Sequence, residues 1–188
     1  MFWRRCPSSQ EVERFLDDSR SLPLSYGRPG LTRADAHRGR LDEMDALIGR
    51  GESDFQRACD ALAEWKHFDL SWVQVFPRHA SIDIGSVVVV RIHHLGFWSL
   101  NGARVVCHAN DDTRFGFAYG TLTNHAEHGE ELFEVRLDPR SGDVAYRIRA
   151  VSWPQAVLAR IGYPFVRHLQ TRFRRDSAAA MRRAVRRT

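Results

Sequence analysis

The stretch WPQAVLARIGYPFVRHLQTRFRRDSAAAMRRAVRR, residues 153–187, decides the fold of this chain. Pro154 favours the start of a helix, Gly162-Tyr163-Pro164 interrupts that helix, and Phe165 resumes it. Apolar and small residues then recur every three or four positions, which predicts a buried stripe on a long helix: Phe165, Leu169, Phe173, Ser177, Ala180 and Ala184. Nine arginines in residues 160–187 occupy the other faces. The helix therefore has one face for a core and one basic face.

Between residues 71 and 151 the helical period gives way to alternation, which predicts strands. The strongest candidate is SVVVVRIHH, residues 86–94, because it is rich in β-branched side chains. Asn101-Gly102 predicts a tight turn, and residues 138–142 predict another. A sheet with one apolar face must cover that face, and the terminal helix is the large element available for this. We therefore predict an α+β fold, with an antiparallel sheet of about seven strands curved around a long C-terminal helix.

The N-terminal third predicts two shorter helices. Ser8 and Glu11 have the spacing of a capping box at the start of the first helix. Ser53 is the predicted cap of the second helix, whose buried stripe comprises Phe55, Ala58, Cys59, Leu62 and Trp65. Residues 22–26 are interpreted as a strand, whereas residues 44–48 are compatible with either a helix or a strand.

Length and composition indicate an ordinary globular domain. The 188 residues, 43% of them apolar, suffice for one domain, which we place at 1–188 with a basic C-terminal tail at 182–188. No apolar run approaches the roughly 20 residues of a membrane span, and no signal-peptide core is present. The cysteines Cys6, Cys59 and Cys107 are too widely spaced to suggest disulfides or a zinc site. We therefore expect a cytoplasmic protein without a transmembrane segment.

The segment NHAEHGEE, residues 124–131, contains side chains that a metal ion accepts. His125 and His128 do not form a recognised ligand motif with the neighbouring glutamates, and a solvated turn is the favoured interpretation. His125 and Glu130 are expected to fix this loop by hydrogen bonds to the backbone. No serine or cysteine occupies a nucleophile elbow, and no glycine loop has a phosphate-binding context. We predict no metal, no cofactor and no catalytic residue.

Large aromatic residues are frequent in the predicted sheet, where they either fill a core or line a cavity beneath the helix. Tyr119 is expected to face inwards, because its strand would otherwise expose a row of aromatic rings. His93 and His94 end the valine-rich strand on opposite faces, so one of them is expected inside. Tyr119 is predicted to share a pocket with Trp98 or His93. The residues predicted to bind a ligand are Tyr26, Trp72, Gln74, His93, Trp98, Phe117, Tyr119 and Tyr163.

Several short motifs occur in a fixed order along most of the chain. They are Ser25-Tyr26-Gly27; Ile48-Gly49-Arg50-Gly51 with Phe55, Ala58 and Trp65; Gly120-Thr121-Leu122 with His125; residues 129–133; and Tyr163-Pro164 with Arg167, Gln170, Phe173, Asp176 and Met181. In these motifs the chain resembles the uncharacterised protein family 0548 (domain of unknown function nineteen-ninety). The resemblance implies the START-like, birch-pollen-allergen-like helix-grip class, which the predicted order of elements supports independently. It implies no activity and no catalytic residues.

Three hypotheses of function remain. The favoured one is a protein that binds an apolar or amphipathic small molecule between the sheet and the C-terminal helix, by analogy of fold. The second is an enzyme that uses an inward His or Tyr in the same cavity. The third is an interaction or nucleic-acid-binding module that acts through the arginine-rich face, toward nucleic acid or another anionic surface. This last hypothesis is disfavoured because the tail holds few aromatic residues and no nucleic-acid motif.

Overall fold

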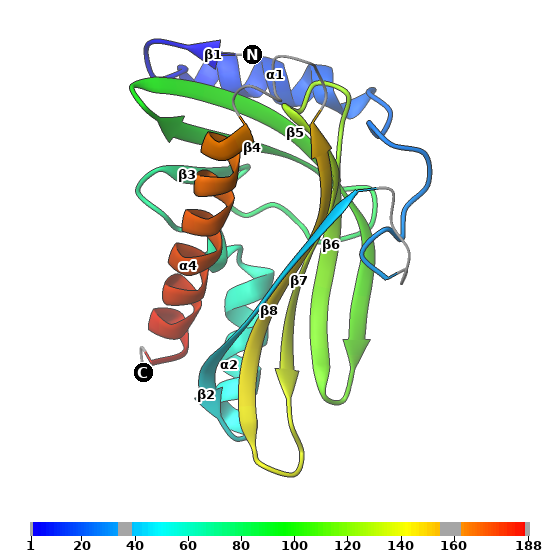
Figure 1. Cartoon of the computed structure of the whole chain (residues 1–188), viewed down its shortest axis with the longest axis vertical. Helices are drawn as coiled ribbons and strands as arrows, with labels where there is room; N and C mark the ends of the chain where they lie inside the picture. Colours follow the sequence, from blue (N-terminus) through cyan, green and yellow to red (C-terminus); the bar gives the residue numbers. More distant parts are fainter. Residues whose placement is uncertain (1, 34–38, 155–162, 187–188) are drawn as a thin grey trace.

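A curved antiparallel sheet forms the body of the protein, with helices α2 and α4 on its concave side (Figure 1). The structure, a computed structural model, describes residues 2–33, 39–154 and 163–186. Seven strands follow the order β2-β8-β7-β6-β5-β4-β3 across the sheet, and a short strand β1 pairs with β5. The strands are β1 (Phe2–Trp3), β2 (Arg40–Arg50), β3 (Val73–Phe76), β4 (Val87–His94), β5 (Phe97–Asp111), β6 (Arg114–Thr121), β7 (Glu127–Leu137) and β8 (Asp143–Pro154). The helices are α1 (Ser9–Arg20), α2 (Glu52–Ala63), the 3-10 turn η1 (Lys66–Phe68) and α4 (Tyr163–Arg186). The predicted fold class is confirmed.

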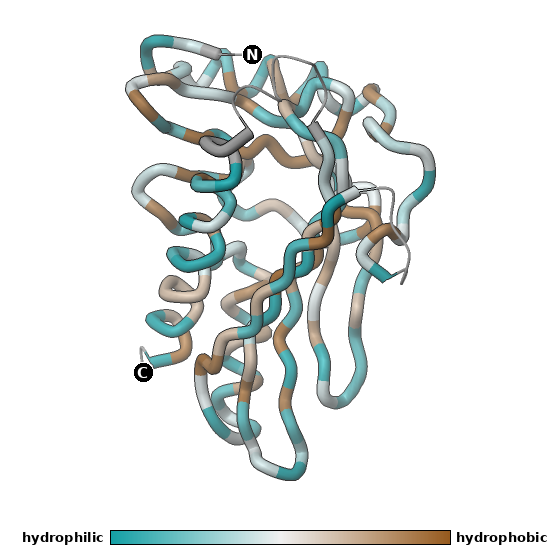
Figure 2. Tube along the Cα trace, in the orientation of Figure 1, coloured by the Kyte–Doolittle hydropathy of each residue, from teal (hydrophilic) through white to brown (hydrophobic). Residues whose placement is uncertain are grey.

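Successive side chains of a strand point to opposite faces of the sheet. Figure 2 shows hydrophobic and hydrophilic residues alternating in this way along the long strands. On β4, Val88 and Val90 point into the main core, whereas Val89 points to the outer face. There Val89 packs against Val12 and Leu16 of α1. The helix α1 therefore covers the outer face of β4 and β5, while α2 and α4 cover the inner one.

The predicted stripe on α4 is confirmed wherever the structure describes its side chains. Ser177 and Ala180 are buried, and Leu169, Phe173 and Ala184 pack against the core. The side chain of Phe165 lies outside the described part. The residues Met181 and Val185, which the predicted stripe omits, are also buried. The buried face of α4 is thus wider than the prediction, as expected for a helix that packs against both a sheet and α2.

The tight turn predicted at Asn101-Gly102 is wrong. The strand β5 runs straight through both residues, and the turn lies at Leu95-Gly96, where φ is 47° and 76°. A two-residue hairpin turn of this kind needs positive φ at both positions, which glycine adopts without strain. Asn101 instead donates a hydrogen bond to the Val90 carbonyl across the strands at 3.3 Å. Glycine is required at 102 for another reason, because a Cβ there would collide with the side chain of Asn124.

Local predictions near the helix ends have mixed outcomes. The capping box of Ser8 and Glu11 is confirmed at the start of α1. The helix α2 begins after Gly51 rather than at Ser53, and no side chain caps its first turn. Asp54 instead accepts a hydrogen bond from the amide of Arg50, just before the helix, at 2.6 Å.

Three predictions concern segments at strand ends. Residues 22–26 form a single bridge between Leu24 and Leu122 rather than a strand, whereas residues 44–48 belong to β2. Pro154 is the last residue of β8, and the helix predicted to follow it falls on residues 155–162, outside the described part of the chain. The predicted interruption near Gly162 lies partly outside the described residues.

The predicted basic tail at 182–188 is, up to Arg186, the last turn of α4. Val185 is 2% exposed, and its carbonyl accepts a hydrogen bond from Arg57 at 3.0 Å. Arg182 donates to the Leu47 carbonyl at 2.8 Å. This turn therefore belongs to the core that α2, α4 and β2 share.

Deleting residues 182–188 is expected to lower the free energy of unfolding by about 2–3 kcal/mol, because it removes one fully buried valine and two hydrogen bonds. Chemical denaturation measures the loss. The variant Arg183→Ala, at an exposed position of the same turn, should stay within about 0.5 kcal/mol of the wild type. A deletion that behaves like Arg183→Ala would show that the last turn does not pack as described.

No helix in the described part of the chain is long and apolar enough to cross a membrane.

Candidate functional site

A cavity of about 260 Å³ lies between the concave face of the sheet and α4. Its walls are mainly apolar and aromatic, and its lining includes Phe68, Trp72, Val90, Ile92, Leu169 and Phe173. Polar side chains from β6, β7 and α4 also face it, including Tyr119, Glu127, Glu131 and Gln170. A largely apolar cavity with a few polar groups is the common form of a small-molecule site.

The central polar group is a pair formed by Tyr119 and Glu131. These residues face each other in the register of β6 and β7, and the Tyr119 hydroxyl donates to Glu131 Oε2 at 2.8 Å. Burial raises the pKa of Glu131 to about 7, and the nearby Glu127 raises it further against the opposing effect of the Tyr119 hydrogen bond. Burial also raises the pKa of Tyr119 well above its usual value. The cavity therefore contains one carboxyl group that titrates near neutral pH.

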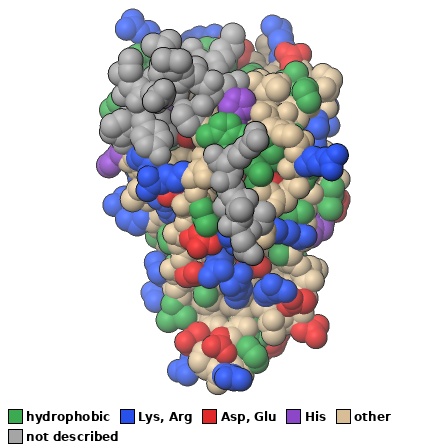
Figure 3. Space-filling model, turned by 45° about the vertical axis from the view of Figure 1, so that its right-hand side comes forward, with side chains coloured by type: hydrophobic (Ala, Val, Ile, Leu, Met, Phe, Trp, Pro, Cys, Tyr) green, Lys and Arg blue, Asp and Glu red, His purple; other side chains and the backbone are tan. Residues whose placement is uncertain are grey.

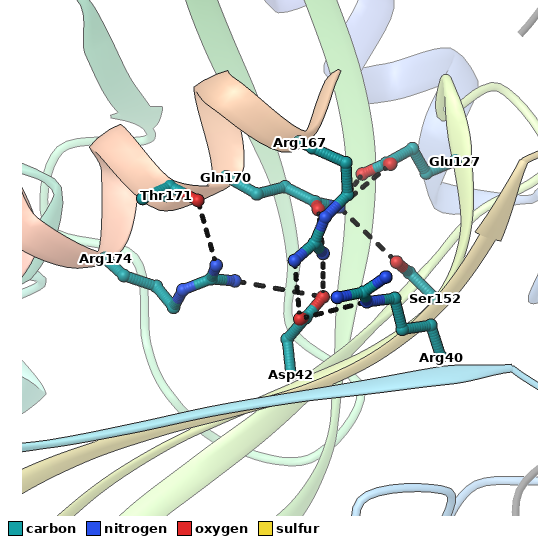
Figure 4. A network of polar contacts seen from close by, with 8 residues as sticks. All are labelled: Arg40, Asp42, Glu127, Ser152, Arg167, Gln170, Thr171 and Arg174. Atoms are coloured by element: carbon teal, nitrogen blue, oxygen red, sulfur yellow. Dashed lines mark hydrogen bonds and ion pairs between the residues drawn. The ribbon is translucent and has the colours of Figure 1, made fainter. Parts of the chain in front are cut away.

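A second polar group joins α4 to the sheet at the edge of the cavity (Figure 4). The Gln170 amide donates to Glu127 Oε1 at 3.0 Å, and burial raises the pKa of that carboxyl. Arg167 donates to Gln170 Oε1 at 2.9 Å and to Asp42 Oδ1 on β2 at 2.8 Å. Arg174 lies 3.9 Å from the same aspartate. Polar contacts as well as the apolar stripe thus hold α4 over the cavity.

Two of the predicted ligand-binding residues, Trp72 and Tyr119, line the cavity. Phe117 also points inwards, but it is fully buried between Trp65 and Phe133, with ring centroids 4.7 and 5.8 Å away. It fills the core rather than lining the cavity. The side chain of Tyr163 lies outside the described residues.

Gln74, His93 and Trp98 lie on the outer face of the sheet, so the prediction that they border the cavity is wrong. The His93 ring stacks on Trp98 at 4.2 Å, and Gln74 accepts a hydrogen bond from Arg91. His94, the next residue along β4, is the histidine that lines the cavity. Successive strand residues point to opposite faces, and the run of four valines before His93 gave no sign of which face was inner.

Tyr26 is buried outside the cavity as well. Its hydroxyl donates to Glu130 Oε2 at 2.9 Å, and the same carboxylate accepts hydrogen bonds from the amides of Gly30 and Thr32. The Tyr26 hydroxyl lies so close to Gly120 that a Cβ there would collide with it. Tyr26 and Glu130 therefore fasten the segment before β2 to the outer side of β6 and β7.

The prediction of a solvated turn at residues 124–131 is correct only for residues 124–126, which connect β6 to β7. Residues 127–131 belong to β7 and line the cavity. The expected backbone hydrogen bonds are present: the His125 ring bonds to the Glu127 amide at 3.0 Å, and Glu130 to Gly30 and Thr32. Burial lowers the pKa of His125 to about 4. No group of three or more His, Cys, Asp or Glu residues in the described ranges could hold a metal ion.

Glu131 is the polar cavity residue that sequence reasoning missed, although a signal for it existed. Phe133 and Val135 alternate with the charged residues Glu134 and Arg136, which predicts that the two apolar side chains share one face of the strand. Continuing the same alternation back by two residues places Glu131 on that face. Gln170 and Arg174 had no comparable signal, because they flank the apolar stripe of α4 and look like surface residues.

The arginines of α4 make contacts within the protein that limit a binding role for this face. Arg167 and Arg174 contact Asp42, and Arg172 and Arg175 both pair with Asp176. In Figure 3, acidic and basic side chains intermingle on the visible face. Binding of nucleic acid through this helix stays a prediction that these contacts disfavour.

Comparisons with known proteins give a family and a fold. Residues 25–180 match the model of a domain of unknown function (DUF1990). A UPF0548 protein from Dictyostelium discoideum is 32% identical over 207 residues, which cover 98% of this chain and 96% of that protein. A hypothetical protein from Helicobacter pylori has a similar structure, with a TM-score of 0.59 at 9% identity over 87% of this chain and 98% of that one. An aromatase/cyclase from Streptomyces sp. R1128 gives a TM-score of 0.51 at 14% identity over 79% and 94%. At such identities the two structures show the fold alone.

Proposed function

We propose that this chain, which belongs to the uncharacterised DUF1990 (UPF0548) family and has the helix-grip fold, binds an apolar or amphipathic small molecule between its sheet and α4. The observation that carries the proposal is the cavity, whose apolar walls surround the Tyr119–Glu131 pair. Its volume of about 260 Å³ lies just below the usual range for ligand pockets, about 300–1,000 Å³, so the proposed ligand is small. That an aromatase/cyclase shares the fold is consistent with a small-molecule cavity.

We expect the apolar and the polar side chains of this cavity to contribute to binding in different ways. Aromatic and aliphatic side chains such as Trp72 and Phe173 supply the apolar surface that drives binding. Glu131 and Tyr119 supply hydrogen-bonding groups that orient the polar end of the ligand. The alternative hypothesis, an enzyme that uses an inward Tyr or His, stays a prediction.

We also propose a cytoplasmic setting for the protein. Its three cysteines are free thiols, and reduced cysteines are the norm in that compartment.

The variant Ala150→Phe is expected to weaken binding of a neutral fluorescent probe, N-phenyl-1-naphthylamine, by at least about tenfold. Ala150 lies on β8 and lines the cavity, so a phenyl ring there would occupy space that the probe needs. Fluorescence titration of the purified full chain measures the affinity, and thermal unfolding verifies that the variant folds.

Ala145→Phe is the matched control, since Ala145 lies on the same strand but an odd number of residues away, on the opposite face. It should bind the probe within about twofold of the wild type. Equal affinity of a folded Ala150→Phe variant, or no binding of the probe to the wild type, would contradict the proposed function.

A further inference from the structure

We infer, on the basis of the proposed ligand cavity, that the polar end of its ligand is a protonated amine held by Glu131 and Glu127 among aromatic rings. The inference rests on the distribution of charge around the cavity, on the partners of the two carboxylates and on the character of the walls.

Both carboxylates that face the cavity are paired with neutral donors. Glu131 accepts a hydrogen bond from the Tyr119 hydroxyl, and Glu127 accepts one from the Gln170 amide. Neither carboxylate forms an ion pair with any residue in the described part of the chain. A cationic ligand would therefore supply the ion pair that the described residues do not form with these carboxylates.

Arg167 and Arg174 lower the pKa of Glu127 and Glu131 respectively, but the carboxylate that both arginines contact is Asp42. Arg167 donates two hydrogen bonds to Asp42, Arg174 lies 3.9 Å from it, and Arg40 lies 3.4 Å from it. The Asp42 carboxylate, at the rim of the cavity, thus contacts three guanidinium groups (Figure 4). Arg174 also lines the cavity, but its charge is shared with Asp42, so the wall formed by Glu127 and Glu131 carries more negative than positive charge, which disfavours an anionic ligand there.

The walls next to these carboxylates suit a cation as well as an apolar body. The rings of Phe68, Trp72, Tyr119 and Phe173 all line the cavity. The face of an aromatic ring attracts a cation, and cages of such rings recognise ammonium groups. Aromatic walls beside acidic groups therefore favour an apolar amine over an alcohol of the same shape, because the uncharged alcohol would form neither an ion pair nor a cation–π contact.

Binding of such a ligand should depend on pH. Burial raises the pKa of Glu131 to about 7, so the carboxyl is largely ionised only above that pH. The groups that face it are Tyr119 from β6, Tyr146 from β8, Glu127 from β7, Arg174 from α4 and Asp42 from β2. His94 and His125 also line the cavity, and burial lowers the pKa of both, so they stay neutral near pH 7. An amine should therefore bind more tightly at pH 8 than at pH 5.5, with uptake of the cation linked to loss of the Glu131 proton.

The test compares three compounds with one apolar body: 3-phenylpropylamine, 3-phenylpropan-1-ol and 3-phenylpropanoate. Calorimetric titration of the full chain at pH 8 should give an amine affinity at least about tenfold above that of the alcohol, with the carboxylate weakest. Glu131→Gln keeps the size of the side chain and removes its charge. It should reduce the preference for the amine over the alcohol to below about threefold. Glu43→Gln, at an exposed carboxylate on β2 that pairs with Arg149, is the control and should change nothing.

A second measurement needs no variant, and it guards against a Glu131→Gln protein that fails to fold. In the wild type, the affinity for the amine should fall at least about threefold from pH 8 to pH 5.5, while that for the alcohol stays constant. Equal affinities for amine and alcohol, or tightest binding of the carboxylate, would overturn the inference. If none of the three binds while N-phenyl-1-naphthylamine does, the amine inference falls and the proposed function stands. If the neutral probe also fails to bind, the proposed function falls first and the inference with it.

Discussion

Replacing Glu130 with alanine is expected to lower the free energy of unfolding by about 3–5 kcal/mol. Glu130 is 2% exposed, and its carboxylate accepts four hydrogen bonds. The donors are the Tyr26 hydroxyl at 2.9 Å, the Gly30 amide at 2.8 Å, and the Thr32 amide and hydroxyl at 3.1 and 2.6 Å. Truncation would leave buried donors without an acceptor, and each unpaired donor costs about 1–3 kcal/mol as long as it stays out of contact with water.

Urea denaturation of the purified variant measures this loss. Tyr26→Phe removes one of the four donors and keeps the ring, so its loss should be only about 1 kcal/mol. Glu43→Ala removes an exposed carboxylate and should stay within about 0.5 kcal/mol of the wild type. A loss below about 1 kcal/mol for Glu130→Ala would mean that this carboxylate does not fasten the segment to the sheet.

Replacing Glu131 with glutamine is expected to stabilise the protein at pH 8 by about 1–3 kcal/mol and to have little effect at pH 4. Burial raises the pKa of this carboxyl from 4.5 to about 7 in the folded protein. Between these two pH values the Glu131 carboxyl is ionised in the unfolded chain but still protonated in the folded one. The contribution of Glu131 to the free energy of unfolding is therefore present below pH 4.5 and is lost as the pH rises through 7. The shift sets an upper limit of about 3 kcal/mol, and access of water from the cavity lowers it.

Denaturation curves of both proteins from pH 4 to pH 8.5 give the difference directly. Buried His67 acts in the opposite sense, because burial lowers its pKa to about 3 and its contribution is lost as the pH falls below 6.5. That acid-side loss is common to the wild type and Glu131→Gln, so it cancels in the difference. Parallel pH profiles for the two proteins would contradict the raised pKa of Glu131. A substitution that stabilises the protein at a ligand-binding residue would be an example of the known trade-off between stability and function.

The candidate site itself was only partly predictable. Tyr119 could be placed inside because an exposed row of aromatic rings would be a liability for association. His93 could not be distinguished from His94, since a shift of one residue exchanges the faces of a strand and both faces of β4 begin with valine. Trp98 and Gln74 followed His93 to the outer face, because β3, β4 and β5 are in register with one another.

The sequence by itself determined the elements whose physics is local. Three features depend only on neighbours within a few positions, so they can be predicted from the sequence. They are the three- and four-residue spacing along α4, the β-branched run of β4 and the capping box of α1. These elements together required a sheet covered by the terminal helix. Only the tertiary structure decided what each face meets. That Glu130 binds the segment around Tyr26, and that Asp42 contacts Arg167 of α4, depends on contacts between residues up to 125 positions apart. Such contacts follow from the register of the strands and the placement of the helices. Both are determined by the packing of the whole core, so no short segment of sequence specifies them.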